Sequence, residues 1–236
     1  MSGYEKTGGE GPTPSLGEQR QHWTAVFAAN ADMYGTDPSQ PSVAAAARFS
    51  ELGVERVLEL GAGQGRDTLY LARQGFDIVA GDYAANAVET IVQKAASVEL
   101  AHRVCVVRHD ARDQLPFAAN AFDASYSHML FNMALTTAEL QHLAAELLRV
   151  VRPGGVVVYT VRHKGDAHYG VGTRRSDDMY ENGGFVVHFF DHDLVLRLAS
   201  VGFEIDDITE FSEGDLPRRL WRVTMSKRGT RLLLAG

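Results

Sequence analysis

Residues 57–84 read VLELGAGQGRDTLYLARQGFDIVAGDYA, and this stretch decides the fold. It opens with a short apolar run, 57–60, that is typical of a buried strand, and a cluster of glycines follows at once. Apolar side chains then recur at helical spacing over 67–74, and a second apolar run occupies 76–80. The order strand, glycine turn, helix, strand predicts a parallel βαβ unit whose turn lies at the carboxyl end of the first strand.

The same alternation continues along the chain. The further elements expected are the helices 86–97, 137–151 and 191–200 and the strands 104–107, 121–125, 156–161, 203–209 and 220–225. Only a loop separates the last two strands, so they should pair antiparallel. The pattern predicts an α/β fold, a Rossmann-like, seven-stranded mixed sheet that is mostly parallel, ends in an antiparallel hairpin and carries helices on both faces.

The composition divides the chain into three parts. Residues 1–16 are rich in Gly, Pro, Ser and Glu and predict a mobile tail. Residues 17–53 predict an N-terminal helical lid, with helices at 19–30 and 43–52. Residues 54–236 predict the main domain, in which 162–190 are polar, dotted with glycines and too long for a simple turn. We expect this insertion to form a cap over the site.

The overall composition excludes several classes of protein. With 45% hydrophobic residues, 22% charged residues and a net charge of −7, the chain is typical of a packed globule and lacks the basic footprint of a nucleic-acid binder. It has neither an apolar stretch long enough for a membrane span nor an export signal, so we expect a cytoplasmic protein. Cys105 is the only cysteine, which excludes an intramolecular disulfide, and its place in a strand predicts burial.

The glycine cluster predicts a ligand site. Gly61, Gly63 and Gly65 allow a ligand to approach the main chain, and the helix behind them offers free N–H groups. A dinucleotide fingerprint would need a glycine where Arg66 stands, and Glu59 places a negative charge near the site of a diphosphate. The pattern therefore favours a ligand without phosphate, and a nicotinamide-dependent oxidoreductase stays as the alternative.

Polar and aromatic side chains follow the next two strands. Asp82 can accept hydrogen bonds from ribose hydroxyls, Tyr83 offers an aromatic face, and Asp110 could accept from an exocyclic amine. Ligands of open α/β sheets bind at the carboxyl ends of the strands, so these residues predict one site for a ribose and a purine.

Two further stretches, HDARDQLPFAANAFDASYSHML (109–130) and ELLRVVRPGGVVVYTV (146–161), follow the first. Together the three resemble the class I S-adenosylmethionine-dependent methyltransferases over about residues 54–161, and the Gly-Arg-Asp at 65–67 is similar to the small-molecule enzymes of the tellurite-resistance and thiol methyltransferase group. The resemblance implies methyl transfer from S-adenosylmethionine to a small molecule by in-line displacement, with S-adenosylhomocysteine as the product.

The resemblance also implies roles for individual residues. The cofactor-binding residues would be Tyr34, Glu59, Gly61, Ala62, Gly63, Asp82, Tyr83, Asp110, Ala111 and Ser127. His128, just after the fourth strand, would be a general base if the acceptor must lose a proton. Possible substrate contacts from the cap are His163, His168, Tyr169 and Tyr180. No metal site is expected, because Asp191, in the one cluster of histidines and aspartates, is better placed to cap a helix.

Several questions stay open at this point. Residues 127–130 read SHML and depart from the Asn/Asp-Pro-Pro-aromatic motif of nucleic-acid amino-methyltransferases, which leaves a small-molecule acceptor. The acceptor atom (N, O, S or C) and the oligomeric state are undetermined. A non-catalytic interaction protein that keeps a methyltransferase-like fold is a further alternative.

Overall fold

A computed structural model describes residues 16–30, 33–214 and 218–229. The tail expected at 1–16 lies outside the described residues, except that Leu16 begins the first helix. None of the described helices is both long and apolar enough to cross a bilayer.

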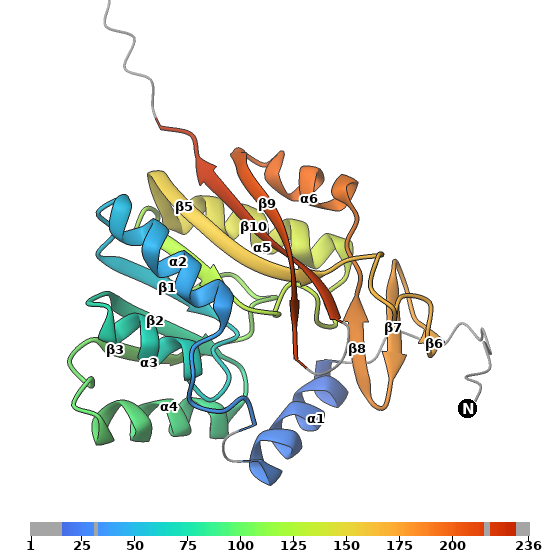
Figure 1. Ribbon diagram of the computed structural model, residues 1–236, viewed down its shortest axis with the longest axis horizontal. Helices are drawn as coiled ribbons and strands as arrows, with labels where there is room; N and C mark the ends of the chain where they lie inside the picture. The colour runs from blue at the N-terminus through green and yellow to red at the C-terminus, as the bar shows by residue number, and fades with distance from the viewer. Residues whose placement is uncertain (1–15, 31–32, 215–217, 230–236) are drawn as a thin grey trace, which may run out of the picture.

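One seven-stranded sheet forms the centre of the molecule, as predicted, in the order β3-β2-β1-β4-β5-β10-β9 (Figure 1). Its strands are β1 (Arg56–Leu60), β2 (Asp77–Asp82), β3 (Val104–Arg108), β4 (Phe122–Ser127), β5 (Val151–Arg162), β9 (Phe203–Glu213) and β10 (Arg218–Lys227). The first five are parallel, and β10 runs antiparallel to both β5 and β9.

Helices cover both faces of this sheet. The helices are α2 (Gln40–Glu51), α3 (Arg66–Arg73), α4 (Ala85–Ser97), α5 (Thr137–Val150) and α6 (His192–Ala199). α5 and α6 enclose one apolar core with the sheet, and α2, α3 and α4 enclose the other. Asp191 caps α6 by accepting a hydrogen bond from the N–H of Leu194, as its place in the sequence predicts.

Two strand predictions need correction. β5 begins at Val151, directly after α5, rather than at residue 156. The glycines near its start do not break the strand, because the pairing of β5 with β4 shifts register between Phe122 and Ala124. The two strands come close at this point: a Cβ on Gly155 would lie 2.5 Å from the Asp123 carbonyl oxygen. Cys105 is exposed rather than buried, because β3 is the edge strand of the sheet.

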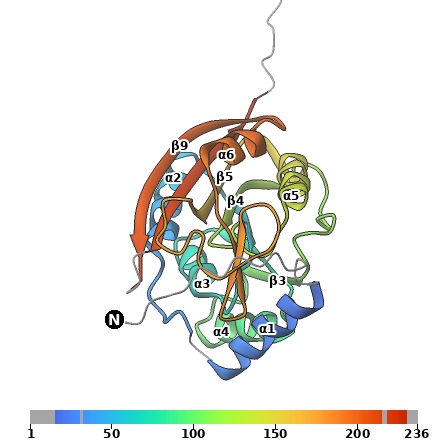
Figure 2. The same ribbon diagram turned by 90° about the vertical axis from the view of Figure 1, so that its right-hand side faces the viewer.

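The segment 162–190 forms a second, three-stranded antiparallel sheet of β6 (Thr173–Arg174), β7 (Met179–Asn182) and β8 (Phe185–His188) (Figure 2). Gly183 and Gly184 both have positive φ, which a two-residue hairpin turn between β7 and β8 requires. Helix α1 (Leu16–Ala29) packs between this sheet and α4: the Trp23 ring lies 5.3 Å from Phe185, and the Gln19 amide donates to the Gly184 carbonyl. The lid segment and the cap segment are therefore neighbours at the carboxyl edge of the main sheet.

Candidate functional site

The glycine turn between β1 and α3 has a backbone that other residues rarely adopt. Gly61, Gly63 and Gly65 have φ values of 70°, 53° and 83°. A Cβ on Gly61 would lie 2.9 Å from Cβ of Leu130, and a Cβ on Gly65 would lie 2.9 Å from the Ile91 side chain. Ala62 is partly buried against the core between them. The three glycines thus adopt left-handed backbone conformations in a closely packed turn. At Gly61 and Gly65 a larger residue would also meet a neighbouring side chain, so only glycine fits there.

Asp82 ends β2 and connects the glycine turn to the next helix. Its carboxylate accepts hydrogen bonds from the N–H of Gly63 and of Ala84, both at 2.9 Å. Burial raises the pKa of this carboxyl group, and the backbone hydrogen bonds oppose that rise. Each oxygen keeps a second lone pair, so the carboxylate can accept further hydrogen bonds from a ligand.

Glu59 lies on β1 beneath the turn and is buried. Its carboxyl group accepts a hydrogen bond of 2.5 Å from the Thr68 hydroxyl at the start of α3. Burial raises its pKa to about 8, although the Thr68 hydrogen bond acts in the opposite direction. This carboxyl group is therefore mostly protonated at neutral pH, and a cation beside it would favour its ionised form.

A small cavity of about 20 Å³ lies next to these residues. It is lined by Gln19, Trp23, Tyr83, Asp110, Ala111, Arg112, Leu130, Met133, Ala134 and Leu135. Three residues of the predicted purine site are therefore together, and α1 supplies two more that the sequence did not assign to it. A purine needs more room than this cavity offers, and a larger, open cavity of about 320 Å³ adjoins it at Tyr83 and Asp110.

Asp110 already has two cationic partners in this cavity. Its Oδ2 lies 3.0 Å from Nη2 of Arg20 on α1, and its Oδ1 lies 3.1 Å from Nε of Arg112. Burial raises the pKa of Asp110, but hydrogen bonds from the Arg112 backbone and from both arginines outweigh it, and the net direction is downward. The Arg20 guanidinium also lies 5.8 Å from the centre of the Tyr83 ring. The ion pair of Arg20 with Asp110 thus links α1 to the carboxylate that is predicted to bind adenine.

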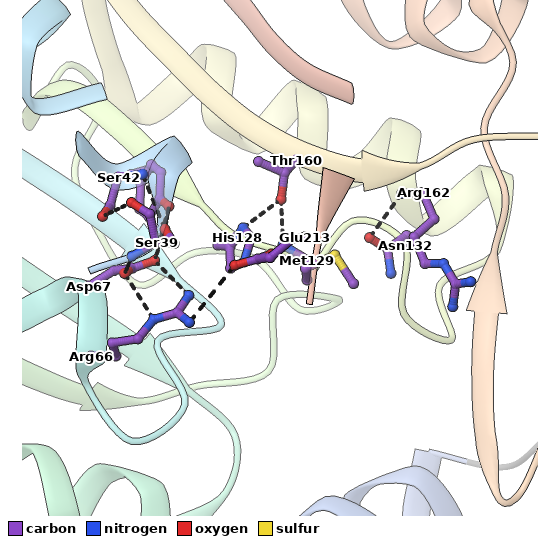
Figure 3. A network of polar contacts seen from close by, with 11 residues as sticks. Ser39, Ser42, Arg66, Asp67, His128, Met129, Asn132, Thr160, Arg162 and Glu213 are labelled. Atoms are coloured by element: carbon purple, nitrogen blue, oxygen red, sulfur yellow. Dashed lines mark hydrogen bonds and ion pairs between the residues drawn. The ribbon is translucent and has the colours of Figure 1, made fainter. Parts of the chain in front are cut away.

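The turn after β4 carries the other predicted residues. Ser127 ends β4, and its buried Oγ has no hydrogen-bond partner among the described residues. Nδ1 of His128 lies 2.9 Å from Oγ1 of Thr160, and its Nε2 lies 3.0 Å from Oε2 of Glu213 (Figure 3). Met129, with φ of 67°, donates its N–H to the same Thr160 hydroxyl. Both nitrogens of the predicted general base are therefore engaged.

Arg66 connects the glycine turn to this group. It contacts Asp67 at 3.1 Å and Glu213 at 3.9 Å (Figure 3). Its guanidinium also lies 5.7 Å from the centre of the half-exposed Tyr34 ring. Asp67 in turn accepts from the Ser39 backbone and hydroxyl and from Tyr126. Tyr34 is thus brought to the edge of the candidate site, beside Arg66.

The four predicted substrate contacts of the cap have contacts of their own elsewhere in the fold. His163 stacks on Trp221 of β10 at 4.4 Å, and His168 lies against the buried ion pair of Arg162 and Asp166. Tyr169 donates to Asp178 and packs edge-on against Tyr180. The contacts described for these four residues are with β5, β9, β10 and other residues of the segment 162–190. Within the described part of the chain, no three His, Cys, Asp or Glu side chains are grouped to hold a metal ion.

Three comparisons place these features among known proteins. Residues 57–155 match a family model described as a methyltransferase domain. A demethylmenaquinone methyltransferase of Clavibacter sepedonicus is 38% identical over 105 residues, which are 44% of this chain and 40% of that protein. The match thus spans well under half the length of the curated relatives.

Two solved structures share the fold over nearly the whole chain. A Burkholderia thailandensis 1,6-didemethyltoxoflavin-N1-methyltransferase, solved with 1,6-didemethyltoxoflavin and S-adenosylhomocysteine bound, superposes with a TM-score of 0.71 at 19% identity over 93% of both chains. The [4+2]-cyclase SpnF superposes with a TM-score of 0.65 at 18% identity, over 94% of this chain and 100% of that one. At such identities the likeness shows the fold alone.

Proposed function

Because the chain carries a class I S-adenosylmethionine-dependent methyltransferase domain, we propose that it transfers a methyl group from S-adenosylmethionine to a small molecule and releases S-adenosylhomocysteine. The observation that carries the proposal is the contact between Asp82 and the Gly63 N–H. In this contact the carboxylate that we propose to accept the ribose hydroxyls lies directly against the glycine turn. A nicotinamide-dependent oxidoreductase and a non-catalytic binding protein are the alternatives.

The donor set at this edge fits the proposed cofactor. Asp82 would accept from the ribose hydroxyls, and Asp110 would accept from the adenine amine. Glu59, whose buried carboxyl group accepts from the Thr68 hydroxyl, would meet the ammonium of the methionine part, and the Ser127 Oγ, which has no partner among the described residues, offers a further polar contact. Tyr83 and Trp23 line the cavity on either side of the adenine site.

The bound cofactor would supply a methyl group on a positively charged sulfur. The task of the chain is then to align donor and acceptor and to exclude water, and positioning of this kind can lower a barrier by about 7–11 kcal/mol. The glycine turn and Asp82 would fix the donor, while α1 would close over it. The turn after β4 would set the direction from which the acceptor approaches.

The finer parts of the proposal follow from the sequence. An acidic chain with SHML at 127–130 favours a small-molecule acceptor over a nucleic acid, and we propose a cytoplasmic location.

A test is to incubate the protein with S-adenosylmethionine and a panel of thiols, phenols, amines and halides and to measure S-adenosylhomocysteine. Because the same fold also occurs in a protein named a cyclase, product release is the decisive readout. Calorimetry in which NAD binds tightly and S-adenosylmethionine does not would reverse the choice of cofactor.

Replacing Asp82 by Asn should weaken cofactor binding. An amide keeps one acceptor oxygen and loses the charge, so we expect S-adenosylhomocysteine affinity to fall roughly 10- to 100-fold by calorimetry. Asp77→Asn, at the exposed start of the same strand, is the matched control and should leave the affinity unchanged. Equal affinities for Asp82→Asn and the unaltered protein would remove Asp82 from the site.

Removing Arg20 should have the opposite effect. The Arg20 guanidinium holds Asp110 and must yield to the adenine amine, so Arg20→Ala should bind S-adenosylhomocysteine roughly 2- to 5-fold more tightly and faster. Arg103→Ala is the control, since Arg103 is an arginine near the surface that pairs with Asp77 at the start of β2, away from Asp110. Weaker binding by Arg20→Ala in stopped-flow measurements would mean that Arg20 helps to hold the cofactor instead.

A further inference from the structure

Glu213 is the last residue of β9, and it lies at the predicted active-site edge although it comes from the far end of the sheet. Its Oε2 lies 3.0 Å from Nε2 of His128, and its Oε1 lies 3.9 Å from Arg66 (Figure 3). The Glu213 side chain is 30% exposed, against 14% for His128. Of this pair, the carboxylate is therefore the group that a ligand can reach.

The hydrogen bonds of His128 fix where its protons lie. A nitrogen that faces a carboxylate at hydrogen-bond distance must carry a proton, so Nε2 donates to Glu213. When the ring is neutral, Nδ1 accepts from the hydroxyl of Thr160, which is fully buried. An acceptor can reach a ring nitrogen of His128 directly only by displacing Glu213 or Thr160. His128 is therefore better suited to position Glu213 than to act as a base.

The groups that face Glu213 keep it ionised. Burial raises the pKa of its carboxyl group, but the hydrogen bond and charge of His128 and the charge of Arg66 outweigh burial, and the repulsion from Asp67 is smaller. The charges of Arg218, Arg66, Asp82 and Glu213 all act on Tyr34, whose pKa is raised mainly by burial. Asp67 pairs with Arg66, and Arg218 of β10 stands opposite Glu213 in the strand pairing, so Glu213 is a fixed carboxylate held among cationic neighbours.

We propose that Glu213 is the acceptor-facing carboxylate of this site and that the acceptor atom is the nitrogen of a neutral amine. This inference rests on the proposed function. The nitrogen lone pair forms the new bond to the methyl carbon, the carbon–sulfur bond breaks, and its electron pair stays on the sulfur. The sulfur becomes neutral and the nitrogen becomes positively charged while keeping its hydrogens, so no base is needed.

The charge on Glu213 matches this reaction and disfavours the alternatives. Positive charge that moves from sulfur to nitrogen arrives beside a fixed carboxylate, which stabilises the transition state more than the neutral amine. A phenol or thiol reacts as its anion, which the same carboxylate repels. Glu213 would therefore select the acceptor atom, and His128 would be a positioning residue that holds the carboxylate in place.

The test compares aniline, phenol and thiophenol, three probes that share one ring and differ in the acceptor atom. S-adenosylhomocysteine formation is followed in the unaltered protein, in Glu213→Gln and in Glu210→Gln. Glu210 is a matched control, because it lies on the same strand and also has a histidine, His163, and an arginine, Arg219, as neighbours. We expect methylation of aniline to fall about 100-fold in Glu213→Gln, at unchanged S-adenosylhomocysteine affinity, and to stay within 2-fold in Glu210→Gln.

The other outcomes separate the possible failures. Turnover of phenol or thiophenol but not of aniline overturns the proposal, as does an aniline rate in Glu213→Gln within 2-fold of the unaltered protein. Equal losses with all acceptors would indicate a merely structural role and also overturn it. If no probe reacts, binding of the probes to the S-adenosylhomocysteine complex decides: aniline should bind the unaltered protein more tightly than Glu213→Gln while phenol should not, and equal aniline affinities for the two proteins contradict the proposal. Failure to bind S-adenosylhomocysteine at all would instead refute the proposed function.

Discussion

Glu59→Gln should be more stable than the unaltered protein at neutral pH and should bind the cofactor less well. The folded-state pKa of Glu59 is about 8, against an ordinary value of 4.5. Between these values the unfolded chain has released the proton and the folded chain still holds it, so the stability falls as the pH rises from 4.5 to 8. At pH 7 the difference corresponds to about 3 kcal/mol, which a glutamine would not lose.

Urea unfolding at pH 5 and pH 8 measures this effect. The unaltered protein should lose stability over that interval, and Glu59→Gln should lose less by about 3 kcal/mol. Glu55→Gln, at an exposed position just before β1, should follow the unaltered protein. Parallel curves for all three proteins would show that Glu59 ionises normally.

The same substitution tests the proposed role of Glu59 in binding. An ammonium beside Glu59 would favour the ionised carboxylate, so cofactor binding below pH 8 should release a proton. Calorimetry in buffers of different ionisation enthalpy measures that release directly. We expect it to disappear in Glu59→Gln, together with part of the affinity. The buried carboxyl group would then be a case in which binding is favoured at the expense of stability.

Gly61→Val should abolish cofactor binding. At φ of 70° a β-branched residue is strained, and its Cβ would lie 2.9 Å from Cβ of Leu130. Either the turn or the segment after β4 must move, and both line the proposed site. We expect S-adenosylhomocysteine affinity to fall at least about 100-fold, with about 1–3 kcal/mol of lost stability.

Gly53→Val separates the effect on binding from the effect on folding. Gly53 has a similar φ of 63°, but a Cβ there would meet nothing within 4 Å, and the residue follows α2 away from the glycine turn. This variant should lose comparable stability in thermal unfolding and keep its affinity. If both variants bound S-adenosylhomocysteine equally well, the glycine turn would not be part of the site.

The sequence predicted the parts of the site that depend on neighbours along the chain. Gly61 and Asp82 follow consecutive strands, and parallel strands bring their carboxyl ends to one edge, so their proximity follows from the strand order. The capping role of Asp191 was equally local. Such features depend on short-range backbone geometry, which residue type largely determines.

Long-range features were missed for a physical reason. The contact between His128 and Glu213 depends on how β9 and β10 pair with β5, and no local pattern encodes that register. Arg20 reaches Asp110 only because α1 packs against α4 and the second sheet. The sequence marked Arg66 as a departure from a dinucleotide motif, but its contact with Glu213 could be found only from the fold.

The residues proposed to bind the methyl donor and the residue proposed to face the acceptor lie in different parts of the chain. The methyltransferase-domain match ends at residue 155, and the glycine turn, Asp82 and Asp110 all lie within it, whereas Glu213 lies beyond it on a terminal hairpin. Substitutions in this hairpin could therefore alter which molecules accept a methyl group while donor recognition is preserved. Redesign of acceptor preference should begin at the outer strands, and grafting the hairpin of another enzyme onto this scaffold is a direct route to it.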